Sequence, residues 1–224
     1  MSISQQLIEA ETLATQLLTE AQARGYFVAH QTEKQLNQKL YNLAYELFGI
    51  KKYWHKRIVR SGANTLLPYK HNPSNLTIQA NDIFFIDFGP VFENWEADIG
   101  QTYVIGNDAH KLKLQHDVEL AWHEGRSYYL QHQQHITCGQ MYQYSQTLAA
   151  KYGWKYTNEH CGHLIGNFPH ENITTEIAAN YLMANNTTLM SAPDAQGNTR
   201  HWIYEIHFVD EAQQIGGFYE RYLI

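Results

Sequence analysis

The feature that most constrains this chain is the segment 81–102, in which two apolar runs enclose a short polar connection. The first run, residues 83–86, leads into Asp87, and the second, residues 103–105, closely follows Asp98. Two β-rich runs around a polar connection predict a β-hairpin. This hairpin would place one carboxylate near the middle of each arm, beside strongly apolar neighbours.

A buried carboxylate is costly unless it is paired or bound to a cation. Asp87 and Asp98 on adjacent strands would also repel one another if both were ionised. A metal ion between them removes both costs, because hard divalent cations prefer oxygen ligands. The alternative interpretation is ordinary turn chemistry without any metal. Other parts of the chain must decide between the two.

Composition narrows the classes of protein to consider. The chain has 224 residues, of which 44% are hydrophobic and 17% charged, so it is expected to be globular with a sizeable core. Sixteen basic against twenty-two acidic residues give a net charge of −6, which argues against nucleic acid or an anionic membrane as partner. No secretory signal or membrane span is visible. Cys138 and Cys161 are too few for a disulfide scaffold, so we expect reduced thiols and a cytoplasmic location.

Helical periodicity predicts helices over residues 2–24, 32–49, 108–131 and 139–152. Strand-like runs lie between and after them, so the expected fold is α+β, with residues 1–224 forming one domain because no linker is apparent. Residues 51–57 form a basic cluster, Lys51, Lys52, His55, Lys56 and Arg57, interrupted by two aromatic residues. We interpret this cluster as a solvated strand edge, with an anion-binding role as the alternative.

The second informative stretch is residues 158–171. Gly162 and Gly166 flank His163, and His170 follows. Glycines allow a ligand to approach the backbone closely, and a neutral imidazole binds Mn, Fe, Co or Zn well. A core histidine satisfied by hydrogen bonds is the alternative for His163 taken alone.

The last stretch contains two predicted strands, residues 202–209 with Glu205 and residues 218–224 with Glu220, joined by residues 213–217. Aromatic and β-branched neighbours make an unpaired carboxylate costly at either place. Glutamates facing solvent from half-exposed strands are the alternative. Together with the two aspartates and His163, the two glutamates form a ligand set of the right size for two divalent ions.

The order Asp, Asp, His, Glu, Glu resembles the pita-bread metallopeptidases, which include methionine aminopeptidase, aminopeptidase P and prolidase. The segment IDFG with Asp87, followed by Asp98 and Thr102, is similar to the paired-aspartate hairpin of that family. The segment CGHLIG through PHE, residues 161–171, resembles its histidine motif, and YEI and FYE match its two glutamate strands. The resemblance covers most of the chain and indicates the catalytic domain alone.

The resemblance implies a pita-bread fold, with an antiparallel-rich curved sheet covered by helices. It also implies two divalent ions, Mn, Fe, Co or Zn, held by Asp87, Asp98, His163, Glu205 and Glu220. A metal-bridging hydroxide would be the nucleophile, Glu205 would also shuttle protons, and His170 would hydrogen-bond the tetrahedral intermediate. His71 lies near the family's substrate-binding histidine, with Tyr69 and Lys70 as alternatives for that position.

Two departures from the family pattern fall beside the predicted ligands. Gln101 stands where the family usually has arginine, and Ile206-His207 stands where it usually has Pro-Gly. The leading hypothesis is a dinuclear hydrolase that cleaves a peptide or amide bond near the amino terminus of a small peptide, such as an Xaa-Pro substrate. The alternatives are a metalloenzyme acting on a small amino-acid-like molecule, including iron-dependent redox chemistry, and a non-catalytic binding module. A homodimer is left open.

Overall fold

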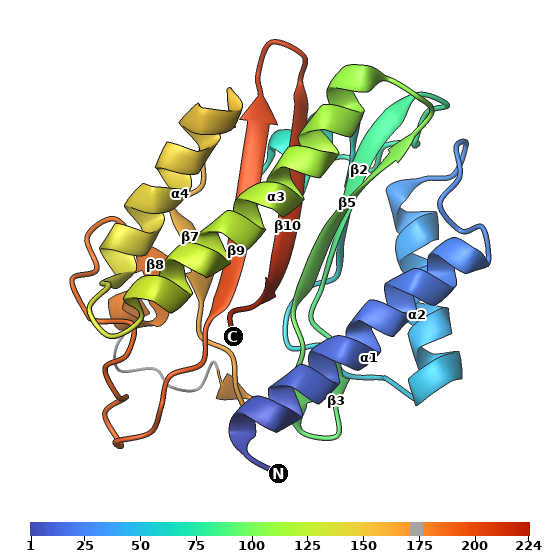
Figure 1. Ribbon diagram of the computed structural model, residues 1–224. Coiled ribbons are helices and arrows are strands. Elements are labelled where there is room, and N and C mark those ends of the chain that lie inside the picture. Colours follow the sequence, from blue (N-terminus) through green and yellow to red (C-terminus); the bar gives the residue numbers. More distant parts are fainter. Residues whose placement is uncertain (171–176) are drawn as a thin grey trace.

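The computed structural model describes residues 1–170 and 177–224 (Figure 1). A six-stranded antiparallel sheet has the order β1-β2-β5-β10-β9-β6. Its strands are β1 (Ile58–Ser61), β2 (Asp82–Phe88), β5 (Ile99–Ile105), β6 (Lys155–Tyr156), β9 (Ile203–Asp210) and β10 (Ile215–Tyr222). The chain is therefore α+β, and two hairpins distant in sequence, β2–β5 and β9–β10, meet at the centre of one sheet.

The four α-helices are α1 (Ile3–Ala23), α2 (Glu33–Phe48), α3 (Ala109–His132) and α4 (Cys138–Tyr152), close to the expected ranges. Helices α1, α2 and α4 each begin with a capping box, and Asp108 caps α3. Helices α2 and α4 end at Gly49 and Gly153, both in the left-handed conformation that glycine adopts without penalty. Ile3 and Leu47, apolar residues near helix ends, lie exposed. No helix in the described part of the chain is long and apolar enough to cross a membrane.

Helices α1 and α3 cross one face of the sheet in Figure 1. One hydrophobic cluster lies between α3, α4 and the β9–β10 hairpin, and a second lies between α1, α2 and the β2–β5 hairpin. Along β9, Tyr204, Ile206 and Phe208 belong to the first cluster. Because side chains alternate between the two faces of a strand, Glu205 and His207 point to the opposite face.

Smaller elements surround that opposite face. They are the two-stranded sheet β3 (Val91–Phe92) with β4 (Trp95–Glu96), the two-stranded sheet β7 (His160–His163) with β8 (Tyr181–Met183), and the 3₁₀ turns η1 (Gly62–Leu66) and η3 (Ile177–Asn180). Strand β10 begins at Ile215, so the predicted connection over residues 213–217 is wrong at its end. Residues 215–217 already pair with β9, with Ile215 opposite Asp210 and Gly217 opposite Phe208.

Candidate metal centre

Three acidic residues lie in one row across the four central strands. Asp87 pairs with Gly100, Gly100 with Glu220, and Glu220 with Glu205. Directly paired residues project from the same face of a sheet, so the three carboxylates share that face. Gly100 leaves a gap in the row, because a Cβ there would lie 2.3 Å from the Phe218 ring and 2.8 Å from Glu220 Cβ. Asp98 precedes Gly100 by two residues and joins the row from just before β5.

These side chains open into a cavity of about 490 Å³. Its lining includes all five predicted ligands and His170, together with residues from the loops around the sheet, among them His55, Arg60, Tyr69, Lys70, His160 and His207. Asp87, Asp98, Glu205 and Glu220 are each at most 7% exposed. Folding thus gathers four carboxylates, from positions far apart in the sequence, at the floor of a cavity large enough for a small ligand.

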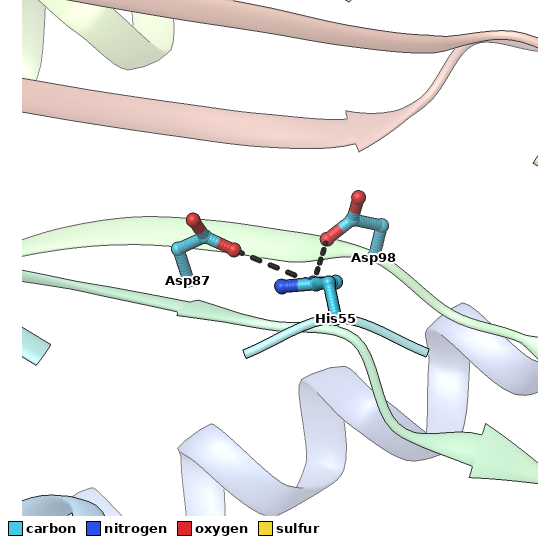
Figure 2. Close-up of side chains that lie close together, drawn as sticks. All are labelled: His55, Asp87 and Asp98. Atoms are coloured by element: carbon cyan, nitrogen blue, oxygen red, sulfur yellow. Dashed lines mark hydrogen bonds and ion pairs between the residues drawn. The ribbon is translucent and has the colours of Figure 1, made fainter. Parts of the chain in front are cut away.

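Asp98 lies between two imidazole rings. Its Oδ1 is 3.1 Å from His55 Nε2, and its Oδ2 is 3.2 Å from His163 Nε2. His55 Nε2 is also 3.6 Å from Asp87 Oδ1, and His163 Nε2 is 3.7 Å from Glu220 Oε1. Figure 2 draws the His55 ring beside both aspartates. The five side chains form two sets of three, each with geometry that could hold a metal ion, and Asp98 belongs to both.

Each of the two glutamates has an oxygen that receives no hydrogen bond from the described residues. Among the described residues, Glu220 Oε2 is buried without a hydrogen-bond partner. Glu205 Oε1 lies 2.6 Å from His160 Nδ1, but without hydrogen-bond alignment. A buried carboxylate oxygen without a donor is costly, and a divalent cation is the partner that such oxygens favour. The donor set therefore fits one or more divalent metal ions.

Electrostatic interactions among the protein groups are strong. Burial raises the pKa of Asp87 to about 7, and it raises the pKa of Glu220 well above its usual range, with the charge of Asp98 adding to the effect. Burial also opposes ionisation of Asp98, but His55 and His163 outweigh it and hold its pKa at about 2. Burial lowers the pKa of His55, but the negative charges of Asp98 and Asp87 outweigh it and raise that pKa to about 9. The site therefore favours a concentrated positive charge beside Asp98.

His170, the predicted hydrogen-bond donor, lines the cavity, and its Nδ1 is hydrogen-bonded to the Glu96 carboxylate. The Glu96 carboxylate is fully buried and accepts hydrogen bonds from the backbone N–H of His170 at 3.1 Å, from that of Gly166 at 3.2 Å, and from His170 Nδ1. The ring is thereby oriented with Nε2 as its remaining polar atom. Glu171 of the same motif lies outside the described residues.

His71 is exposed and is not among the residues that line the cavity. Its carbonyl oxygen accepts a hydrogen bond from Arg60 at 2.8 Å. The two alternatives for its position, Tyr69 and Lys70, do line the cavity. The structure thus places His71 in the loop at the site but does not bring its side chain to the carboxylates.

The two departures from the family pattern have structural partners. Arg221 donates to Gln101 Oε1 at 2.5 Å and to the Gly100 carbonyl at 2.7 Å, so a neutral amide at position 101 accepts from a cation that comes from β10. His207 Nε2 donates to the Thr65 carbonyl at 2.7 Å, and Nδ1 lies 3.0 Å from the Asn158 side chain. His207 therefore links β9 to η1 and to the loop that carries Asn158, a residue that lines the cavity.

Sequence reasoning missed two residues at this site. His55 was expected on a solvated edge, but its ring is 5% exposed and faces Asp87 and Asp98, which is a correction to that interpretation. Glu96 belongs to the polar connection of the predicted hairpin, for which the sequence indicated no role. The local sequence did contain a sign that His55 is buried, because this histidine follows an aromatic pair, Tyr53-Trp54, within an otherwise basic segment. Nothing in the local sequence distinguishes Glu96 from its exposed neighbour Glu93.

Comparisons with known proteins identify the family and the fold. The family model of metallopeptidase family M24 matches residues 5–210, whereas no curated protein matches the chain. Among solved structures, an X-Pro aminopeptidase from Thermotoga maritima MSB8 superposes with a TM-score of 0.72 at 20% identity, covering 97% of this chain and 56% of that one. The prolidase from Pyrococcus furiosus gives 0.71 at 17%, with 97% and 60% covered.

A methionine aminopeptidase from Thermotoga maritima gives a TM-score of 0.67 at 14% identity and covers 95% of this chain and 88% of that one. By contrast, the chain spans only 55% of the length of another match, the solved prolidase from Thermococcus sibiricus. At identities this low, the TM-scores establish the fold alone, and the expected pita-bread architecture is confirmed. Because the family model matches most of its length, the chain belongs to metallopeptidase family M24.

Proposed function

We propose that this chain is a dinuclear metal-dependent hydrolase that cleaves a peptide or amide bond near the amino terminus of a small peptide. Asp87, Asp98, His163, Glu205 and Glu220 would hold the two cations. The observation that carries the proposal is the row of buried carboxylates across four strands, with Asp98 facing both neighbouring sets of ligands. Mn, Fe, Co and Zn all suit mixed carboxylate and imidazole donors.

Two divalent cations at this place would supply Lewis-acid chemistry, lowering the pKa of a water molecule and polarising a substrate carbonyl. Glu205 is the carboxylate positioned to hold and move a proton, because its Oε1 faces the cavity beside His160 Nδ1. His170, oriented by Glu96, would donate a hydrogen bond to the substrate oxygen as it gains charge. Tyr69 and Lys70, with the neighbouring His71, belong to the loop that we propose contacts the substrate.

Substrate size follows from the cavity. A volume of about 490 Å³ accommodates a dipeptide or tripeptide but not a folded protein surface. The printed names of the similar structures include an X-Pro aminopeptidase, prolidases and a methionine aminopeptidase, so Xaa-Pro peptides are the first substrates to test. Both cysteines are free and buried, which agrees with the reducing, cytoplasmic location that we propose.

The test begins with metal analysis of the purified protein. We expect about two equivalents of transition metal per chain, and loss of both in Asp98→Ala, because Asp98 belongs to both ligand sets. Glu93→Ala is the matched control, since it removes an exposed carboxylate from the same hairpin. Unchanged metal content in Asp98→Ala would contradict the proposed metal centre.

Activity is then measured with Mn- or Co-loaded protein on a panel of Xaa-Pro dipeptides, longer Xaa-Pro peptides and peptides that begin with methionine. Release of the amino-terminal residue from any of them supports the hydrolase. Turnover that requires Fe(II) and oxygen would instead favour redox chemistry on an amino-acid-like molecule. Capture of a protein partner by a chain that turns over nothing would favour the binding module.

A further inference from the structure

We propose that His55 is a sixth metal ligand in this chain, binding through Nε2 the same cation as Asp87 and Asp98. The inference rests on the metal centre proposed above and adds a donor that is not part of its five-residue set. His55 comes from the segment before β1, and Figure 2 shows its ring directed at both aspartates.

The backbone around His55 is fixed to the aspartate hairpin. The Trp54 N–H donates to the Gly89 carbonyl at 2.9 Å, and the Val91 N–H donates to the Lys52 carbonyl at 3.1 Å. The Trp54 indole N–H donates to the Ala97 carbonyl at 2.9 Å. Residues 52–55 are therefore bound to the chain just after Asp87 and just before Asp98, which holds the ring in place before any ligand arrives.

Gly89 provides the space that the His55 ring occupies. A Cβ at position 89 would lie 2.1 Å from His55 Cδ2, 2.4 Å from His55 Nε2 and 2.4 Å from Trp54 Nε1. Any other residue would displace one of these two rings. The glycine after Asp87-Phe88 is therefore required by the approach of His55 to the carboxylates.

His55 and His163 are bonded in the same way. In each, Nδ1 lies 2.8 Å from the carbonyl oxygen of the next residue, Lys56 or Leu164. A carbonyl oxygen only accepts, so Nδ1 carries the hydrogen in both rings and Nε2 is directed to the carboxylates. A backbone carbonyl on the far nitrogen is the usual support of a metal-binding histidine.

The distances suit coordination. Two atoms bound to one ion at about 2.1 Å lie roughly 3.0–3.4 Å apart for angles between octahedral and tetrahedral. His55 Nε2 is 3.1 Å from Asp98 Oδ1, within this range, and 3.6 Å from Asp87 Oδ1, slightly beyond it. The corresponding distances of His163 Nε2, a ligand implied by the family, are 3.2 Å to Asp98 Oδ2 and 3.7 Å to Glu220 Oε1. The two histidines are thus equivalent in their approach to opposite oxygens of Asp98.

This equivalence gives each cation one imidazole. The first set is His55, Asp87 and Asp98, and the second is Asp98, His163 and Glu220. With His163 alone, one of the two ions would have only oxygen donors from the protein. An imidazole in both sets favours Mn, Fe, Co or Zn over Mg or Ca at both positions, because imidazole is a better ligand for the transition metals.

The test counts histidine ligands in the Co(II)-loaded protein by proton NMR. Each imidazole bound through Nε2 contributes one strongly shifted, solvent-exchangeable Nδ1–H signal. Two such signals in the unaltered chain, with one lost in His55→Ala and the other in His163→Ala, support the proposal. A single signal, assigned to His163, overturns it. This count in the unaltered chain decides the matter even if a variant fails to fold.

Calorimetric titration with Co(II) provides the second measurement. His55→Ala and His55→Gln are each expected to weaken one of the two binding steps by at least about tenfold, since even supporting residues of a metal site cost that much. His135→Ala, which removes an exposed histidine after α3, should change nothing. Equal or tighter binding in His55→Ala would show that the ring only pairs with the aspartates or competes with the metal, and would overturn the inference.

Failure of this inference differs from failure of the proposed function. If the unaltered chain binds no metal, the metal centre itself is wrong. If it binds two ions and only His163→Ala weakens one, the centre stands and His55 is not a ligand. If His55→Ala changes only the KM for peptide, His55 contacts substrate and not metal.

Discussion

Replacing Glu96 with glutamine tests whether the carboxylate behind His170 positions the ring for catalysis. Glu96 is fully buried and accepts from two backbone N–H groups and from His170 Nδ1. Glutamine keeps one oxygen but turns an NH₂ group toward at least one of these donors. Losing a hydrogen bond to a charged acceptor costs about 1.5–3 kcal/mol, and in a chain of this size that lowers the Tm by about 3–12 °C.

The effect on activity is expected to be larger than the effect on metal binding. Among the described residues, the Glu96 carboxylate accepts hydrogen bonds from Gly166 and His170 and from none of the five proposed metal ligands. Glu96→Gln should therefore reduce kcat by about 10- to 100-fold while the metal content stays unchanged. The assay is steady-state cleavage of the best Xaa-Pro peptide by Mn-loaded protein, together with thermal unfolding and metal analysis of the same samples.

A double-mutant comparison separates positioning from simple destabilisation. In a His170→Ala background, Glu96→Gln should cost little further activity, because the ring that it orients is gone. The loss in Tm should persist, because the backbone N–H groups of Gly166 and residue 170 still face position 96. Equal losses of kcat in both backgrounds, or unchanged kcat in the single variant, would refute the role of Glu96 as a positioning residue.

Three further predictions concern stability and metal. Burial raises the pKa of Glu11 to about 7, so the folded protein binds more protons than the unfolded chain between about pH 4.5 and 7, and stability falls as pH rises through that window. Glu11→Gln should therefore raise the free energy of unfolding by about 1–3 kcal/mol at pH 8, the lower part of this range reflecting partial exposure, and change little at pH 4, as measured by denaturant titration. Gly100→Ala should destabilise by about 1–3 kcal/mol and weaken metal binding, because its Cβ would meet the Phe218 ring; equal Tm and metal content would contradict this. Adding Mn(II) at 100 times its Kd should stabilise the chelator-treated protein by about 2.7 kcal/mol per site, with no shift in Asp98→Ala.

The local sequence determined much of this fold because its signals act over a few residues. Capping boxes at Thr32 and Thr137 and left-handed glycines at positions 49 and 153 set helix limits within a residue or two. Alternating apolar residues set the face of β9 from which Glu205 projects. The carboxylates themselves were visible because charge is rare within apolar runs, and burial makes it costly there.

Only the tertiary structure decided how these residues meet. The β5–β10 pairing, between strands separated by more than a hundred residues, places Glu220 opposite Gly100 and completes the acidic row. The position of His55 depends on hydrogen bonds between residues 52–55 and the hairpin, and on the missing side chain of Gly89. That of Glu96 depends on a loop some seventy residues later. Such contacts follow from packing and register across the whole chain, which no local pattern of residues encodes.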